Sequence, residues 1–259
     1  MNTDTWEWSY VGEKGEEIHE RNSHSLDILD YGSDGKYLFL YGGASPEKGV
    51  FKDAFYARLP ENDDEIASDI TSFHVEWIKL AESTEETGPG DREMHGTCVV
   101  GGSELIVLGG RNEKGNMFDD AWKLILRRSN DSDQPENMFV WNKVESLNLP
   151  FKCCAHTLNI ISGTDGIEYL CLFGGFQERD GEVGISNDFY SCLLSESFSM
   201  SWKEVSYEGL PLSRRFGHCS TQISRSSGAA AIIIFGGVKE DEDLSDVWII
   251  DGTSPATPI

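Results

Sequence analysis

Four stretches of the chain end in the same pattern, an apolar run followed by a pair of glycines. The stretches are YLFLYGG, ELIVLGG, EYLCLFGG and AIIIFGG, and their glycine pairs are Gly42 and Gly43, Gly109 and Gly110, Gly174 and Gly175, and Gly236 and Gly237. One histidine lies ahead of each pair, namely His24, His95, His156 and His218. Landmarks that recur in one order at a long period decide the architecture, so we expect one structural unit repeated four times.

Two further landmarks keep the same order in every unit. A tryptophan followed three positions later by an aliphatic residue precedes each histidine, at Trp8, Trp77, Trp141 and Trp202. An aspartate followed two positions later by an aromatic residue comes after each glycine pair, at Asp53, Asp120, Asp188 and Asp246. We expect the aromatic rings to fill the space between neighbouring sheets, the glycines to permit positive φ or close approach, and the aspartates to accept backbone N–H groups in turns.

Each unit also contains four short runs rich in β-branched, aliphatic and aromatic residues, which predict four strands. We name them a to d: strand a follows the histidine, b ends in the glycine pair, c follows the aspartate and d carries the tryptophan. Successive tryptophans are 69, 64 and 61 positions apart, which is too long for one coil of a β-solenoid and favours the blades of a β-propeller. The predicted units are 12–80, 81–144, 145–205 and 206–251 together with 1–11, in a single domain spanning 1–259.

These motifs resemble the kelch repeat family. The resemblance includes Arg-x-x-His, which begins at Arg21, Arg92 and Arg215, whereas Cys153 takes the arginine position in the third unit. The units are longer than the roughly 50 residues of a kelch repeat, and kelch propellers commonly have more than four blades. The resemblance implies an all-β, kelch-type β-propeller with four recognisable blades of four antiparallel strands.

The two ends of the sequence carry complementary strands. The chain opens with a strand-d sequence, WEWSYV, and closes with a strand-c sequence, DVWIID. We therefore expect N-terminal strand d to join C-terminal strands a to c and close the ring, because closure protects strand edges that would otherwise be exposed. An open arc, whose missing blades are either supplied by another chain or absent from this sequence, is the alternative.

Charge and composition limit the partners and the location. The 21 Lys and Arg residues stand against 45 Asp and Glu residues, a net charge of −24, so the average surface repels nucleic acid. The sequence lacks an apolar run of about 18 residues and the basic flank and apolar segment of a secretion signal. We expect a protein of the cytoplasm or the nucleus, without a membrane or nucleic-acid partner, whose six cysteines are reduced.

Strand direction alternates within a blade, so the d–a and b–c loops should emerge on one face and the a–b and c–d loops on the other. The family resemblance places the arginines of Arg-x-x-His on the first face, near the mouth of the central channel, where kelch propellers often bind peptides. We expect Arg21, Arg92 and Arg215, with Arg214 beside the last, to bind an acidic segment or carboxylate of a protein partner, since the planar guanidinium grips carboxylates at two points. The alternative is that each arginine pairs with a local acid such as Glu20, Asp91 or Glu93 and only supports a turn.

The four histidines raise the possibility of a metal ring. They lie on different blades, and a metal would require them to converge to about 2 Å from one point, so we expect structural histidines and neither a metal nor a cofactor. No nucleophile with a base and no phosphate-binding loop stands out. The favoured function is a non-enzymatic protein-interaction module of the scaffold or adaptor type, and the alternative is a kelch-propeller enzyme that processes sugars or small molecules, with or without a metal.

Overall fold

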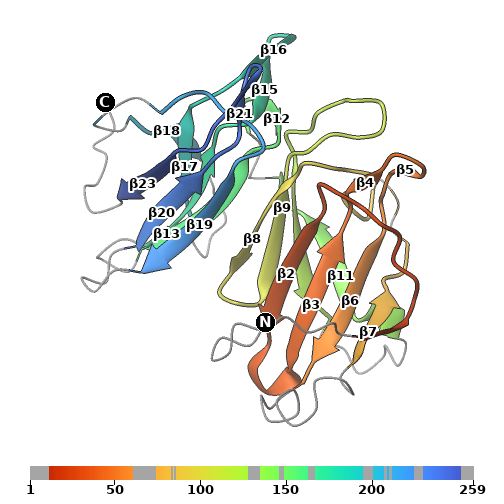
Figure 1. The fold of residues 1–259 in the computed structure, drawn as a ribbon. Helices are drawn as coiled ribbons and strands as arrows, with labels where there is room; N and C mark the ends of the chain where they lie inside the picture. The colour runs from red at the N-terminus through yellow and green to blue at the C-terminus, as the bar shows by residue number, and fades with distance from the viewer. Residues whose placement is uncertain are drawn as a thin grey trace.

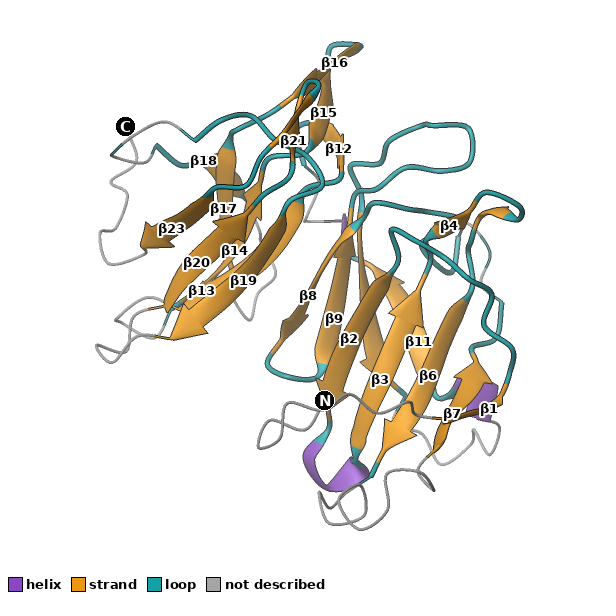
Figure 2. Cartoon of the chain, viewed as in Figure 1, coloured by secondary structure: helices purple, strands orange, loops and turns teal. Residues whose placement is uncertain are grey.

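The computed structural model describes residues 12–60, 74–82, 84, 86–127, 135–145, 149–162, 167–194, 201–206, 209, 212–224 and 230–251. The chain in these ranges consists of β-strands and loops, with two 3-10 helices, η1 (Gly32–Asp34) and η2 (Pro135–Asn137) (Figure 2). The predicted all-β class is confirmed. Within these ranges no helix has the length and apolar character needed to cross a membrane.

The first two repeat units form the first two large sheets (Figure 1). In the first sheet, β2 (Ser25–Asp30), β3 (Lys36–Tyr41), β6 (Ala54–Leu59) and β7 (His74–Lys79) are the predicted strands a to d, paired antiparallel. The second sheet contains β8 (Gly96–Val100), β9 (Glu104–Leu108), β10 (Ala121–Leu126) and β11 (Phe139–Lys143) in the same order.

The third and fourth units repeat this topology. The third sheet consists of β13 (Thr157–Ser162), β14 (Glu168–Phe173), β17 (Phe189–Leu193) and β18 (Trp202–Glu204). The fourth consists of β19 (Cys219–Ser224), β20 (Ala230–Phe235) and β23 (Val247–Asp251), so strands a to c of this unit are described.

Hairpins in the b–c loops add three small sheets at the end of the blades where the glycine pairs lie. They pair β4 (Ala44–Ser45) with β5 (Gly49–Val50), β21 (Val238–Lys239) with β22 (Glu242–Asp243), and β12 (Lys152–Cys154) with β15 (Phe176–Arg179) and β16 (Glu182–Ile185). The sequence analysis did not predict these sheets.

Consecutive large sheets pack face to face around apolar cores. Alternation along a strand sends successive side chains to opposite faces, so every sheet has a leading face, turned toward the preceding unit, and a trailing face, turned toward the next. Phe39 and Tyr56 of the first trailing face meet Trp122 and Trp141 of the second leading face in one buried cluster. The predicted packing of tryptophans between sheets is confirmed for Trp141, which is 8% exposed, and for Trp202, which is half-buried against the cluster between the second and third sheets. Trp77 is also 8% exposed but packs against Leu40 and Phe55 of its own sheet, and Trp8 lies outside the described residues.

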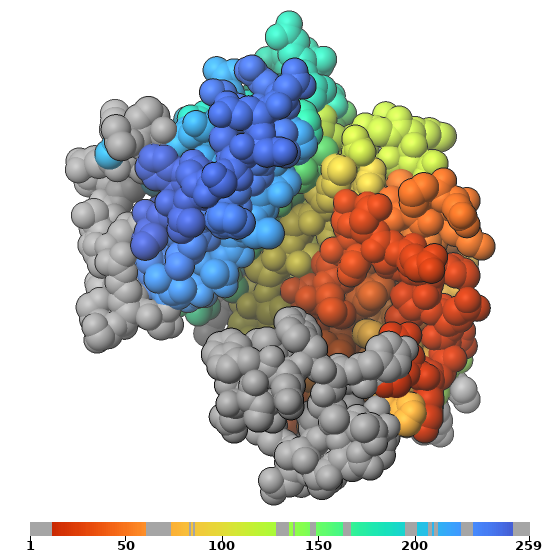
Figure 3. All heavy atoms as spheres, in the orientation of Figure 1, coloured from red at the N-terminus to blue at the C-terminus, as the bar shows by residue number. Residues whose placement is uncertain are grey.

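The four sheets form an arc. Inner strands of consecutive units contact one another, as β2 with β8, β8 with β13, and β13 with β19. No pairing between the first and last sheets is present in the described part of the chain, and β8 is seen between them in Figures 1 and 3. Closure by the N-terminal strand stays a prediction, because residues 1–11 lie outside the described ranges. The next segment, β1 (Gly12–Gly15), pairs in parallel with β7 of the first sheet.

Candidate functional site

A clamp between an arginine and an aspartate holds the loop end of the first, second and fourth units. In the second unit, Nη1 of Arg92 donates to Oδ1 of Asp120 at 3.0 Å and to the carbonyl of Gly109 at 2.9 Å. Nη2 donates to the other carboxylate oxygen at 3.3 Å, so the ion pair is bidentate. The same bonds connect Arg21 with Asp53 and Gly42, and Arg215 with Asp246 and Gly236.

In the second and fourth units, the aspartate of the clamp also joins a tryptophan of strand c to the arginine. The indole N–H of Trp122 donates to Oδ2 of Asp120 at 2.8 Å, and Trp248 makes the equivalent bond to Asp246. Hydrogen bonds from Arg215 lower the pKa of Asp246 to about 2. These aspartates therefore accept side-chain donors, which the sequence analysis did not predict, and Asp246 also accepts a backbone hydrogen bond.

Burial of the clamp changes the interpretation of the arginines. Arg92 is 1% exposed and Arg215 is 0% exposed, so a partner could reach their guanidinium groups only if the ion pairs opened. The arrangement favours the alternative in which the arginines support the loops, although the predicted acids were wrong. Glu93 instead accepts a hydrogen bond from Arg111, and Asp91 accepts one from the backbone N–H of Glu113. Partner binding by Arg21, Arg92 and Arg215 stays a prediction, and Arg214, beside the last clamp, is exposed.

In the third unit, which lacks the arginine of Arg-x-x-His, Arg179 from another part of the chain binds the aspartate instead. Cys153 is buried where the other units have arginine, and Asp188 receives its hydrogen bond from Nη2 of Arg179 at 3.1 Å. Arg179 comes from strand β15, and its guanidinium lies 4.4 Å from the centre of the Phe151 ring. Its side chain is 44% exposed, so this is the one clamp of the described units whose arginine faces solvent to a large extent.

The glycine pairs and the backbone at the arginine position connect neighbouring units. Gly43 donates its N–H to the carbonyl of Arg92 at 3.0 Å, Gly110 donates to Cys153 at 2.8 Å, and Gly175 donates to Arg215 at 2.8 Å. All eight glycines have positive φ. A Cβ on Gly42 would lie 2.5 Å from the carbonyl oxygen of Arg92, so the predicted need for positive φ and close approach is confirmed.

Three of the repeat histidines also contact neighbouring units, two of them through hydrogen bonds. Nε2 of His95 lies 3.0 Å from the Ser25 hydroxyl, and Nε2 of His218 lies 3.0 Å from the Thr157 hydroxyl. The His156 ring faces Gly96, which has no side chain to bond, and its Nε2 is 4.0 Å from the Cys153 thiol. In the described part of the chain no three His, Cys, Asp or Glu side chains are grouped so that they could hold a metal ion.

Burial removes the reactivity of these groups near neutral pH. Burial, followed by the charge of Arg92, lowers the pKa of His95 to about 3, and burial lowers that of His156 to about 3 as well. Burial likewise raises the pKa of the Cys153 thiol well above its ordinary value and that of Cys154 to about 11. The histidines are therefore neutral and the two thiols protonated, which suits packing rather than proton transfer or thiolate chemistry.

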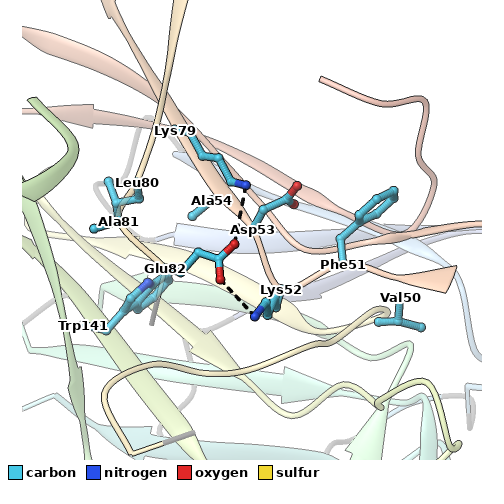
Figure 4. A pocket seen from close by; sticks show the side chains of 10 residues that line it. All are labelled: Val50, Phe51, Lys52, Asp53, Ala54, Lys79, Leu80, Ala81, Glu82 and Trp141. Atoms are coloured by element: carbon cyan, nitrogen blue, oxygen red, sulfur yellow. Dashed lines mark hydrogen bonds and ion pairs between the residues drawn. The ribbon is translucent and has the colours of Figure 1, made fainter. Parts of the chain in front are cut away.

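A pocket of about 210 Å³ opens on the face formed by the d–a and b–c loops, between the first and second units (Figure 4). Residues 50–54, from the b–c loop and the start of strand c, and 79–82, at and after the end of strand d, form its sides, and Leu80 and Trp141 supply apolar surface. Glu82 accepts a hydrogen bond from Lys52 at 3.2 Å and lies 3.8 Å from Nζ of Lys79.

The rim of this pocket is accessible to a partner. The side chains of Lys52, Lys79 and Glu82 are 57%, 39% and 64% exposed. The sequence analysis missed these residues because they belong to no repeat landmark. Their position directly after strand d, or between the glycine pair and strand c, is the signal that could have placed them on this face.

Comparisons with known proteins agree with the repeat pattern. No family model matches the chain. An F-box/kelch-repeat protein of Arabidopsis thaliana is 27% identical over 271 residues, covering 96% of this chain and 49% of that protein. Adagio-like protein 3 of Oryza sativa subsp. japonica is 26% identical over 220 residues, covering 84% and 29%. The tRNA wybutosine-synthesizing protein 4 of Aspergillus fumigatus is 29% identical over 160 residues, covering 61% and 13%.

The chain therefore spans at most about half the length of these curated relatives. Among solved structures, YjhT aligns with a TM-score of 0.50 at 13% identity, covering 92% of this chain and 83% of that one. A structure of RAG in complex with one melted and one unmelted RSS also aligns with a TM-score of 0.50, at 15% identity, covering 86% and 61%. These two likenesses concern the fold alone.

Proposed function

We propose that this kelch-repeat protein is a non-enzymatic interaction module that binds a protein partner on the face of its d–a and b–c loops. One observation carries the proposal: this face holds a pocket with an apolar wall and a charged, exposed rim. Protein-recognition surfaces combine an apolar anchor site with a polar rim in this way. The relatives that are F-box/kelch-repeat and Adagio-like proteins support the same class of function.

The charges of the rim suggest the chemistry of the partner. Lys52 and Lys79 both lie next to Glu82, and a carboxylate of the partner could take the place of Glu82 between them. In a chain of net charge −24, such recognition must be local, because exposed charges are screened beyond about 8 Å at physiological salt. The proposed partner thus presents an acidic residue beside an apolar one.

A charge reversal with a matched control tests the proposal. Lys52→Glu should weaken capture of protein partners from a cell extract, measured by quantitative mass spectrometry against the parent protein. Lys36→Glu is the control, because Lys36 is a lysine of the same unit with 58% exposure that lies at the opposite end of the sheet, at the start of strand b. Equal partner recovery from both variants, or a loss confined to Lys36→Glu, would contradict the assignment of this face.

An enzymatic function is the competing candidate, and the named relative that acts in wybutosine synthesis supports it. The chain spans 13% of that protein, so the activity is not carried over. A turnover screen with sugars and small metabolites, run with added divalent metals, separates the two: turnover that survives Lys52→Glu would favour the enzyme.

A further inference from the structure

Each junction between consecutive units repeats a backbone hydrogen bond at the residue before the histidine. Met94 donates its N–H to the carbonyl of Ser23 at 3.1 Å, Ala155 donates to Met94 at 2.8 Å, and Gly217 donates to Ala155 at 3.0 Å. A second recurring bond runs from the second glycine of a pair to the next unit's arginine position, as described above. Three junctions thus share one bonding pattern.

The two ends of the arc carry opposite halves of this pattern. On the first unit, the N–H of Ser23 has no backbone acceptor among the described residues. On the fourth unit, the N–H of Gly237 and the carbonyl of Gly217 likewise have no backbone partner there. His24 lies exposed at the position where the other histidines bind the preceding unit, and Cys219, its expected counterpart, is the exposed cysteine of the fourth unit.

The apolar faces at the two ends are also exposed in part. On the leading face of the first sheet, Leu26 and Ile28 of β2 are 52% and 56% exposed, whereas Leu40, Phe55 and Trp77 of the outer strands are buried in a cluster with Ile18. On the trailing face of the fourth sheet, Phe235, Val247 and Ile249 are 53%, 61% and 54% exposed. The corresponding faces of every other junction are packed in buried clusters. Contiguous apolar exposure of this kind marks an interaction surface.

We propose that the trailing face of the fourth unit binds the leading face of the first unit of a second copy of this chain, so that two arcs associate head to tail. The complementary bonding groups support this occupant, because the new junction would repeat the backbone hydrogen bonds of the three junctions that the structure contains. A heterologous contact of this type closes into a ring when its rotation permits. Two copies would supply eight units, within the range of about four to eight blades known for propellers.

Closure of one chain on itself is the competing arrangement. No strand of the first sheet pairs with a strand of the last in the described part of the chain, and β2 and β19 do not pack as the inner strands of consecutive units do, so closure would require the three junctions to change their angles. Their cores are close-packed, and packed cores resist such rearrangement. A second copy extends the series without altering any of them.

The mass of the purified chain in solution is the first test. Multi-angle light scattering after size-exclusion chromatography should give twice the 28.8 kDa of one chain across a dilution series. A monomer throughout the series overturns the proposal, whether the chain closes on itself or stays open.

Charged substitutions then test which faces meet. Ile249→Glu and, on the other end, Ile28→Glu should each lower the measured mass toward that of the monomer without changing the circular dichroism spectrum of the folded chain, since both side chains are more than half exposed in the single chain. Val183→Glu is the matched control: Val183, in the β16 hairpin, is 59% exposed and lies on neither end face. Val247→Glu replaces Ile249→Glu if that variant fails to fold.

Mixing the two variants tests the direction of the contact. Ile249→Glu retains a normal leading face and Ile28→Glu retains a normal trailing face, so the mixture should associate although neither variant associates alone. A parent dimer that only Ile249→Glu dissociates would be a symmetric contact between trailing faces and would overturn the head-to-tail arrangement. A dimer that resists both substitutions would overturn the choice of faces.

Discussion

Arg92 joins three parts of the second unit through one side chain. Its guanidinium connects the loop before strand a, through Pro89, with the end of strand b, through Gly109, and with the start of strand c, through Asp120. An arginine suits this position because its fork of donors satisfies several acceptors in a fixed geometry. Burial of the pair means that the loss of either partner leaves an uncompensated charge.

Arg92→Ala should therefore destabilise the protein by about 3 kcal/mol or more, as expected when one partner of a buried ion pair is removed. Arg179→Ala is the matched change in the third unit, where the arginine is 44% exposed, and it should cost at most about 1 kcal/mol as a solvent-screened pair. Urea denaturation of the two variants measures the difference. Equal costs would show that the buried clamp does not stabilise its unit as argued.

Acidification should destabilise the protein, because three histidines are buried in their neutral form. The folded structure lowers the pKa of His95 and His156 to about 3 and that of His218 to about 4, from an ordinary value of 6.5. As pH falls through 6.5, the unfolded chain binds these protons and the folded chain does not, so stability is lost from that pH downward. Burial raises the pKa of Asp27 to about 6, which acts in the opposite direction, but one carboxyl does not offset three imidazoles.

The midpoint of urea unfolding should accordingly be lower at pH about 5 than at pH about 7.5, a range in which few other groups titrate. His95→Gln should reduce the size of that shift, because it removes one of the three groups. A midpoint that stays constant over the range would contradict the neutral, buried state of the histidines.

At the residue scale, the sequence predicted which positions recur but not what they contact. Arg21, Arg92 and Arg215 were correctly identified as one equivalent position, yet their acids lie 32, 28 and 31 residues away. Proximity in the sequence pointed to Glu20, Asp91 and Glu93 instead. Pairing across a sheet depends on strand register, which repeat spacing alone does not supply.

At the element scale, each glycine pair ends strand b in a conformation that other residues adopt at a cost. Gly43 has φ of 91°, and a Cβ there would lie 2.6 Å from the carbonyl oxygen of Asn22. Gly115 has φ of 78°, with no atom within 4 Å of the place of a Cβ. A side chain at Gly115 would therefore cost backbone strain alone, whereas a side chain at Gly43 would cost backbone strain and a steric clash.

Gly115→Ala should destabilise the protein by about 1 to 2 kcal/mol, the cost of the left-handed conformation for a residue with a Cβ. Gly43→Ala should cost more, since the backbone of the first unit must also move. Thermal unfolding of both variants by circular dichroism checks the order. A smaller loss for Gly43→Ala than for Gly115→Ala would show that the pair is not tightly packed.

Strand assignment from the sequence succeeded where the apolar runs were longest. Strands a, b and c of all four units were predicted, as were the tryptophan strands β7, β11 and β18. The two-residue and three-residue strands of the loop hairpins, such as β4 and β12, were not, because such short segments carry no periodic signal. The parallel pairing of β1 with β7 depends on tertiary contact and had no local signal either.

At the scale of the whole molecule, the repeat order predicted the succession of sheets, and the pocket and the arc had to come from the structure. The pocket forms between two units from residues that do not recur, such as Lys52 and Glu82. The angle between units depends on how side chains of unequal size fill each core, as Tyr41 does against Trp141, with ring centroids 5.2 Å apart. A repeat pattern specifies equivalence between units, whereas packing specifies their angle.

The N-terminal strand provides the last prediction. Strand β23 is the edge of the fourth sheet among the described residues, and an uncovered edge is a site for pairing with other chains. If residues 1–11 pair with β23, in the same chain or in a second copy, their deletion should lower the melting temperature and increase aggregation, measured by light scattering during heating. Deletion of residues 252–259, which follow β23, is the control and should change neither quantity, because the predicted blade does not use them. A protein lacking residues 1–11 that melts and scatters light like the parent would mean that another segment protects this edge, and the N-terminal strand would have no part in closing the ring.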